Sequence, residues 1–424
     1  MKKIIIIAVI AIIMPSMLIM SAFIPKSAIR KGTLSSAEYL NSHDMFGCVI
    51  DGVEGSRIDG YADSILLNIA YHLDKDHPLK SVALSAYYFT PDHEENENLL
   101  AAVRDDPGMN RQYLRYWHGS IAFIRPLLTM MPIQGIFIVN SCIMIALFAV
   151  YVILLLRMKE YVPVISMTIA LILTRVWFVP LSLEYTWMIM LMLVCSIAVI
   201  ILYSKGLQKY YGLLFVLSGM ATAFVDFLTT ETLSLLVPIL IMIWLERRRD
   251  MTSKEIYTAP VRYSIEWGIA YALMWSSKWL FTSIVMKENA MPYVLEHVEE
   301  RIGGDLGLSM WQYITGAVKN NIGCLFPLGY GAVGYILFTA LIIYAIYRAF
   351  VYRTGGWDGR RIAVMAVIGL VPYIRYLVLH NHSYIHCFFT FRAQLATVMA
   401  VVLILSELTG HGSKAAQNPC DKIA

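Results

Sequence analysis

The feature that most constrains this chain is a series of long apolar runs. The first follows Met1-Lys2-Lys3 and extends to about Phe23, and others recur at short intervals between residues 132 and 408. A helix that crosses the hydrocarbon core of a bilayer needs about 20 predominantly apolar residues. Hydrophobic residues make up 58% of the chain and charged residues only 15%, which excludes an ordinary soluble protein. The sequence therefore predicts an all-α polytopic membrane protein.

Ten segments are predicted to span the membrane. They are residues 1–24, 132–156, 161–179, 184–204, 210–228, 232–246, 263–285, 327–347, 361–379 and 389–408. No small-residue cleavage site follows the first span, so we interpret it as an uncleaved signal anchor. We expect four parts: the first helix, an extracytoplasmic loop with juxtamembrane helices, a multi-span domain and a cytoplasmic tail. Their bounds are 1–24, 25–130, 131–408 and 409–424.

The orientation of these spans is predicted from basic residues in alternate loops. The basic loops contain Arg157 and Lys159, Lys205 and Lys209, Arg247 to Arg249, and Arg348 to Arg361. Positively charged loops stay on the cytoplasmic side of a membrane. We therefore expect a multi-pass protein of the cell membrane with both termini in the cytoplasm.

The predicted extracytoplasmic ends of the spans carry many titratable groups, both acidic and basic. They are Asp59, Asp63, Arg115, His118, Arg125, Glu184, Asp226, Glu231, Arg375, His380, His382, His386 and Arg392. Such groups at the ends of membrane helices indicate a polar cavity on one side of the membrane, while some serve only as interface anchors. Arg175 and Lys278 lie inside apolar spans, and we expect Lys278 to be a buried ion-pair partner.

A segment between Gly303 and Phe326 is too short and too polar to span the membrane. Its apolar residues mark one helical face, formed by Met310, Trp311, Ile314, Val318 and Ile322. We expect this helix to lie on the outer surface.

The most informative acids lie in the stretch from Arg57 to Leu79. Its apolar residues have helical spacing, at Ala62, Ile65, Leu66, Ile69 and Leu73. This pattern predicts a short helix with one buried and one wet face. Asp59 stands where the helix begins and Asp63 in its first turn. Each carboxylate is therefore either a helix-stabilising group or a functional one.

Charge and cysteine spacing exclude several classes of protein. The net charge of +4 is small and the basic residues are scattered, which argues against nucleic-acid binding. Six cysteines form no CxxC pair, so a zinc or thioredoxin-like site has no support. The predicted topology places Cys48, Cys324 and Cys387 outside, where the sequence alone assigns no disulfide.

Two pieces of the chain resemble the GT-C glycosyltransferases, polytopic enzymes that take a sugar from a lipid phosphate, such as the protein mannosyltransferases. Asp59-Gly-Tyr61, a short helix and Asp76-His77-Pro78-Leu79 resemble the family's first luminal loop. The segment from Tyr116-Trp117-His118-Gly119 to Leu127, with Asn140 in the next span, is similar to its aromatic and His-containing helix entry. The likeness covers roughly residues 1–157. Asp59 and Asp63 depart from the adjacent acids or DxD of many members, so no metal role is carried over.

The resemblance implies transfer of a sugar from a polyprenyl phosphate. Asp59 is the candidate catalytic base that takes the acceptor's hydroxyl proton, and Asp63 is the second candidate. The candidate substrate-binding residues are Arg115, His118, Asp226, Arg375, His382, His386 and Arg392. Cations among them would stabilise charge on the departing phosphate, unless the outer acids neutralise them. Asp226 is either a helix cap or a contact to sugar hydroxyls or to a second basic group.

No cofactor is required by the sequence. His382 and His386 stand four residues apart and would share a helical face, so a divalent cation is an alternative to hydrogen-bonded loop histidines.

We therefore expect a glycosyltransferase of the cell envelope. Its partners would be a lipid-linked sugar donor, a saccharide, lipid or protein acceptor, and membrane lipids. The main alternative is a transporter or flippase of lipid-linked saccharides, and a third is a non-catalytic assembly protein. Transporters place polar groups near the midplane and contain internal repeats. This chain has no visible repeat, and its polar groups gather at one side.

Overall fold

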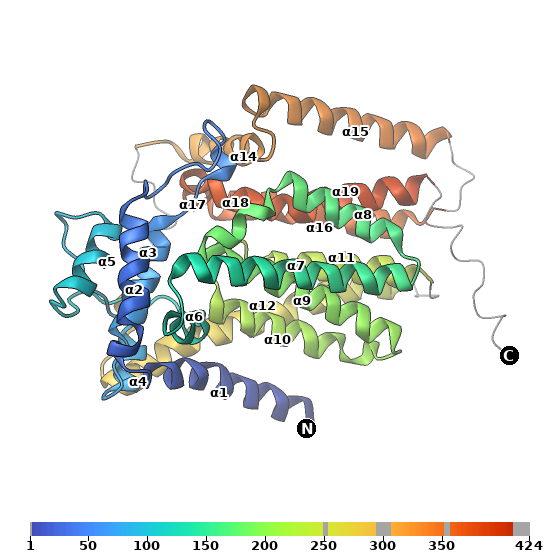
Figure 1. Cartoon of the computed structure of the whole chain (residues 1–424). Helices are drawn as coiled ribbons and strands as arrows, with labels where there is room; N and C mark the ends of the chain where they lie inside the picture. The colour runs from blue at the N-terminus through green and yellow to red at the C-terminus, as the bar shows by residue number, and fades with distance from the viewer. Residues whose placement is uncertain (1, 249–252, 294–306, 352–356, 410–424) are drawn as a thin grey trace.

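The computed structural model describes residues 2–248, 253–293, 307–351 and 357–409. Over these residues the chain is all-α, with short 3-10 helices and two isolated β-bridges. Long helices run side by side in a bundle, and shorter helices form a layer across one end of it (Figure 1).

The shorter helices, here named the end layer, come from the segment between the first two long helices. They are α2 (Lys26–Asn41), η1 (Glu54–Ser56), α3 (Gly60–His72), α4 (Pro78–Leu84), α5 (Glu95–Arg104) and α6 (Ile121–Leu128). Two later helices lie at the same end of the bundle, α14 (Met310–Leu325) and α17 (His380–Ile385). The expected extracytoplasmic loop therefore coincides with a folded layer.

The bundle contains the remaining helices. They are α1 (Lys2–Ala22), α7 (Ile133–Arg157), α8 (Tyr161–Leu173), η2 (Val176–Leu181), α9 (Leu183–Ser204), η3 (Gln208–Tyr210), α10 (Tyr211–Val225), α11 (Leu233–Leu245), η4 (Glu246–Arg248), α12 (Ser253–Met286), η5 (Leu328–Gly331), α15 (Ala332–Val351), α16 (Gly359–Val378), α18 (Cys387–Thr390), η6 (Phe391–Gln394) and α19 (Leu395–Leu408).

Six helical segments among the described residues are long and apolar enough to cross a membrane. They are Lys3–Ala22, Ile133–Arg157, Leu183–Ser204, Ala332–Val351, Gly359–Val378 and Cys387–Leu408. This confirms the expectation of a multi-pass membrane protein. The other four predicted spans coincide with α8, α10 and α11, of 13, 15 and 13 residues, and with the more polar α12. Helices of that shorter length extend only about 20 Å, less than the hydrocarbon thickness of about 30 Å.

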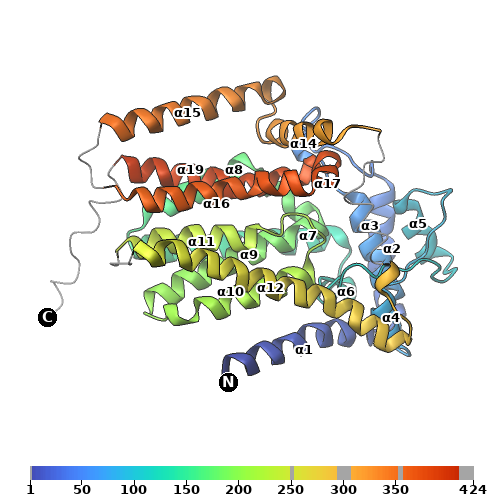
Figure 2. The same ribbon diagram turned by 180° about the vertical axis from the view of Figure 1, so that it is seen from behind.

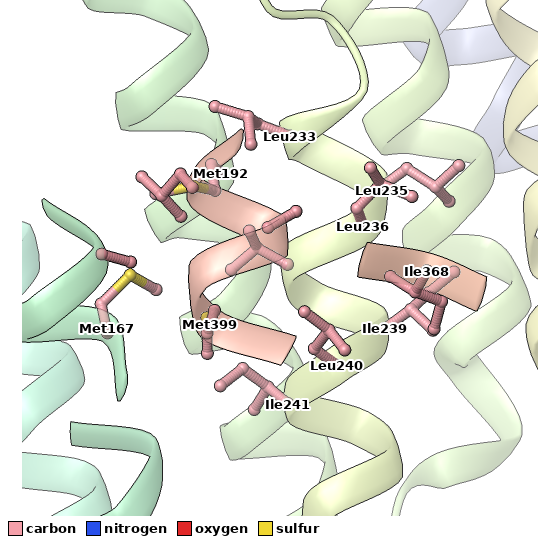
Figure 3. Packing of buried hydrophobic residues seen from close by; sticks show 14 of the residues in the cluster. Met167, Met192, Leu233, Leu235, Leu236, Ile239, Leu240, Ile241, Ile368 and Met399 are labelled. Atoms are coloured by element: carbon pink, nitrogen blue, oxygen red, sulfur yellow. The ribbon is translucent and has the colours of Figure 1, made fainter. Parts of the chain in front are cut away.

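Helix α11 is the centre of the bundle. Each of its residues from Leu233 to Leu245 is buried. Leu235, Leu236, Ile239 and Leu240 of α11 lie among Met192 of α9, Ile368 of α16 and Met399 of α19 (Figure 3). A helix that is apolar on all sides must be surrounded by other helices, so a length below the bilayer thickness is compatible with its position.

Helix α12 presents an apolar stripe outward. Ile265, Ile269, Leu273, Leu280 and Ile284 are each between 56% and 67% exposed. They recur at multiples of about four residues and so share a face. An exposed apolar stripe of this length suits contact with lipid, even though α12 is more polar than the other long helices.

Helix α3 begins and ends close to its predicted bounds, but it does not expose one face to solvent. Every residue from Asp63 to His72 is buried, and Tyr61 alone in this helix is exposed. The prediction of a solvent-exposed face on this helix is therefore wrong. The hydrophobic pattern showed one apolar face, but α2, α5, α6 and α9 all contact α3 and enclose the polar face as well.

The expected surface helix also exists; of the apolar face marked in the sequence, its first two residues are exposed and the other three are half-buried. Tyr313, Ala317, Asn321 and Cys324 are the buried side of α14. Met310 and Trp311, from the face marked in the sequence, are 64% and 74% exposed. Because buried small and polar residues make the contacts of α14, the apolar pattern identified the helix and not its packed side.

The start of α1 and the end of α19 lie at the bundle end opposite the end layer (Figures 1 and 2). Buried Glu160 at this opposite end forms ion pairs with Arg247 and Arg248 at 2.8 and 2.7 Å. Two residues of the basic loops, Arg249 and Arg353, lie outside the described residues, and so does the predicted tail from residue 410.

The positive-inside pattern predicts that the end layer faces outward. A membrane-impermeant maleimide, applied to sealed cells, should label a single cysteine at exposed Lys75 and leave one at exposed Lys205 unlabelled. The six native cysteines would first be replaced by serine, and both positions should react after permeabilisation. Labelling at Lys205 with protection at Lys75 would reverse the orientation.

Candidate functional site

The start of α3 places a buried carboxylate where the end layer meets the bundle. Asp59 is the N-cap residue, and its Oδ1 accepts a hydrogen bond of 2.9 Å from the backbone N–H of Ala62. Its Oδ2 accepts a hydrogen bond of 3.2 Å from the hydroxyl of Tyr185 on α9. Asp59 is only 4% exposed. The capping interpretation therefore holds for one oxygen, while the second oxygen is oriented from the bundle.

Asp63, one turn later, stabilises the start of a different helix. Its Oδ1 accepts hydrogen bonds from the backbone N–H of Leu183 at 2.9 Å and from the hydroxyl of Ser182 at 3.2 Å. These groups form the N-terminus of α9, whose first N–H groups have no partner within the helix. The structure thus uses Asp63 to fasten α3 to α9.

Both carboxyls are harder to ionise than usual. Burial raises the pKa of Asp59 from 3.8 to about 6, although the hydrogen bonds from Ala62 and Tyr185 and the charge of Arg57 lower it. Burial, with the neighbouring Asp59 carboxyl, raises the pKa of Asp63 well above its usual value. Adjacent buried carboxyls resist double ionisation, so the less buried Asp59 ionises first.

Asp59 lines a cavity of about 90 Å³. The lining residues are Asp59, Tyr61, Ala62, Ile65 and Leu66 from α3, Tyr113, His118, Glu184, Phe227, His382, His386 and Phe389. Five segments of the sequence converge here, at the bundle end that carries the end layer (Figures 1 and 2). Four of the lining residues besides Asp59 are histidines or a glutamate, so the predicted polar cavity is present.

His118 is held in a strained conformation against aromatic rings. Its φ is +54°, a region that side chains other than glycine seldom occupy and that recurs at functional sites. Its ring centroid lies 4.8 Å from that of Tyr113 and 5.0 Å from that of Phe227. Burial and the charge of Lys278 lower the pKa of His118 well below its usual value. The imidazole is therefore neutral at physiological pH.

Two further histidines line the cavity from the short helix α17 and its C-cap. The ring centroids of His382 and His386 are 4.8 Å apart, and Phe389 packs against both rings. This is the spacing that suggested a divalent cation. Over the described part of the chain, no three His, Cys, Asp or Glu side chains are grouped so that they could hold a metal ion.

Arg375 lies outside the cavity and is neutralised. Its guanidinium holds Glu231 through two hydrogen bonds, at 2.6 and 3.1 Å, and donates to the carbonyl of Leu228 at 2.7 Å. Asp226 accepts hydrogen bonds from the backbone N–H groups of Leu228 and Thr229 and so closes the turn after α10. Both residues stabilise the turn that carries Phe227 into the cavity lining.

Arg392 and Arg115 also lie outside the cavity lining. Arg392 is buried, donates to the carbonyls of Phe388 and Gly55 at 3.2 Å, and lies over the Tyr185 ring at 5.3 Å. Half-buried Arg115 lies over the Tyr113 ring at 4.9 Å. Each therefore contacts an aromatic residue that itself meets Asp59 or the cavity.

Buried and half-buried cations elsewhere in this region bind carbonyl groups at the C-terminal ends of helices. Lys278 donates to the carbonyl of Val82 at 2.5 Å near the end of α4, in place of the expected ion pair. Arg175 donates to the carbonyl of Cys324 at 2.5 Å near the end of α14. Arg125 does the same to Ala70 of α3 at 2.7 Å.

Sequence reasoning missed the aromatic part of the site and gave Glu184 little weight. Tyr185 orients Asp59, and Tyr61, Tyr113 and Phe227 line the cavity. The signal available in the sequence was the polar start of a span at Ser182-Leu-Glu184-Tyr185. Ordinary interface residues at the end of a membrane helix give the same sequence pattern, so this signal does not distinguish them from site residues.

No family model matches the sequence, and no curated protein or solved structure matches the chain.

The role of Asp63 predicts a loss of stability on truncation. Asp63→Ala would leave two buried donors at the start of α9 without their acceptor, at a cost of about 1–3 kcal/mol each. Asp63→Asn retains a side-chain oxygen and should lose less. Chemical unfolding of the purified protein in detergent measures the difference. The exposed Asp92→Ala is the control, and equal stability of the Asp63→Ala and Asp92→Ala variants would contradict this role.

Proposed function

We propose that this protein is a GT-C-like membrane glycosyltransferase of about ten spans. It moves a sugar from a polyprenyl-phosphate donor to an acceptor on the outer face of the membrane. The observation that carries the proposal is the buried Asp59 carboxyl, with a pKa raised to about 6, in a cavity with His118, Glu184, His382 and His386.

The groups in the cavity suit the chemistry of sugar transfer. Asp59 would accept the proton of the acceptor hydroxyl as that oxygen attacks the anomeric carbon. The hydroxyl of Tyr185 holds the carboxylate in place, which limits the reorganisation needed at the moment of transfer. His382 and His386 would donate hydrogen bonds to the departing phosphate. Arg392, stacked on Tyr185, adds positive potential without lining the cavity.

The dimensions of the cavity define a further requirement. A volume of about 90 Å³ holds roughly three water molecules and is smaller than the 300–1,000 Å³ typical of ligand sites. The cavity in this state therefore accommodates the reacting groups and not a whole saccharide. Tyr61 is 41% exposed and is the lining residue whose displacement would widen it.

A separate apolar cavity supports a lipid-linked donor. Its volume is about 530 Å³, and its lining includes Phe338 and Ile342 of α15, Leu370 of α16 and Ile404 of α19. A lining of this composition suits a hydrocarbon chain. Ile322 of α14 belongs to the same lining, which brings the cavity to the bundle end that carries the candidate site.

Asp59→Asn should remove transfer while preserving the fold. Asparagine keeps an oxygen for the N–H of Ala62 but is no base, and loss of a general base costs about 10²–10⁴-fold in rate. The assay is release of polyprenyl phosphate from a polyprenyl-phosphate sugar by purified protein. Asp92→Asn, an exposed acid of the same layer, is the matched control.

Full activity of the Asp59→Asn variant would remove this residue from the catalytic role. A transporter or flippase would instead move the lipid-linked sugar across a vesicle membrane and leave the sugar–phosphate bond intact. Absence of any cleavage by the wild-type protein, together with such movement, would replace the enzyme proposal.

The raised pKa predicts a pH profile. A base works only when deprotonated, so the rate should fall about tenfold for each pH unit below about 6 and level off above it. The Tyr185 hydrogen bond lowers the pKa of Asp59, so Tyr185→Phe should shift the midpoint to higher pH. A midpoint near the ordinary aspartate value of 3.8, or one that Tyr185→Phe leaves unmoved, would contradict the assignment.

A further inference from the structure

Helix α14 is fastened to the segment that carries two of the cavity histidines. The side-chain amide of Asn321 donates to the carbonyl of Ser383 at 2.8 Å and accepts from the hydroxyl of Thr390 at 2.8 Å. The ring of Tyr313 lies 5.9 Å from that of His380. These contacts hold α14 against α17 and α18 along most of its length.

Two cysteines lie at this junction, one on each helix. Cys324 follows Asn321 by one helical turn, and Cys387 begins α18 three residues before Thr390. Both side chains are buried, at 3% and 8% exposure, in one hydrophobic cluster, and α14 packs against α18. They are present as free cysteines, on adjacent helices whose positions the Asn321 contacts already fix.

A cation lies next to this pair. The guanidinium of Arg57 stacks over the ring of Phe388 at 5.3 Å, and its charge interacts with Cys387 and with Cys48. A neighbouring cation favours the thiolate, which is the reactive form of a cysteine. Arg57 is itself paired with Glu54 at 2.7 Å, so the greater exposure of Cys387, 8% against 3% for Cys324, makes Cys387 the better placed of the pair to react first.

We propose that Cys324 and Cys387 form a disulfide that fastens α14 to α18 beside the candidate site. The oxidant would be a thiol–disulfide exchange donor, either a small disulfide or a disulfide-bearing protein, of the compartment outside the membrane. The predicted topology places both cysteines there, where disulfides persist. This proposal is independent of the transferase activity.

The bond changes balance as two exchange steps. The Cys387 thiolate attacks one sulfur of the donor disulfide, forms a mixed disulfide and releases the other donor sulfur as a thiolate. The Cys324 thiol then loses its proton and attacks the Cys387 sulfur, which releases the second donor sulfur. The two cysteines are oxidised, the donor is reduced to two thiols, and the two donor thiolates take up the two protons that the cysteines lose.

The consequence is a covalent link between a surface helix and the cavity wall. Helix α17 carries His382, and its C-cap is His386, both in the cavity lining. The disulfide would restrict movement of α14 away from this wall. Reduction would leave the Asn321 hydrogen bonds as the main polar tie.

The test counts free thiols in full-length protein taken from cells. Membranes are dissolved in denaturant with excess N-ethylmaleimide, and the intact mass gives the number of modified cysteines. We expect four of the six cysteines to be modified without reduction and all six after reduction. Fragment masses should join the peptides that contain Cys324 and Cys387.

Serine variants identify the partners. In Cys387→Ser, Cys324 is released, so all five remaining cysteines should be modified without reduction. Cys48→Ser is the matched control, because Cys48 also lies near Arg57. In that variant three cysteines should be modified before reduction and five after. Six modified cysteines in unreduced wild-type protein, or loss of the disulfide in Cys48→Ser, would overturn the proposal.

Discussion

The contact between helix α3 and the first turn of α9 is the interaction on which the rest of the structure depends. Asp63 accepts hydrogen bonds from the N-terminus of α9, and Asp59 accepts one from the hydroxyl of Tyr185 in the same turn. A helix buried on all sides would ordinarily exclude two carboxylates, because burial without partners is costly. Here a backbone N–H and two hydroxyls at the start of a membrane helix provide the partners, and they tie the end layer to the bundle.

Buried and half-buried cations make a related contact at the C-terminal ends of helices. Lys278, Arg175 and Arg125 donate to carbonyl groups near the C-termini of α4, α14 and α3. Those carbonyls lack partners within their helices and carry the negative end of the helix dipole. In an apolar environment the attraction between such a cation and the helix C-terminus is strong, whereas bulk water would screen it. Some of the charged side chains gathered at this end of the bundle are therefore structural.

This division explains what the sequence could predict. The apolar runs predicted the membrane helices, and the spacing around Ile65 predicted α3, because hydrophobic periodicity is a local property. Asp59, His118, His382 and His386 were predicted as site residues, and the structure brings them to one cavity. The partner of each charge depends on contacts between distant segments. Pairing of Arg375 with Glu231 across 144 residues has no local signal, nor has the burial of the second face of α3.

Asp59, at the junction of the end layer and the bundle, has a pKa raised to about 6, so its carboxyl is neutral below that pH and ionised above it. Infrared difference spectroscopy of the purified protein measures it directly, since a protonated carboxyl has its own carbonyl stretching band. We expect a band that disappears as the pH rises through about 6 and that is absent from the Asp59→Asn variant. A titration near 3.8, or an unchanged band in that variant, would contradict it.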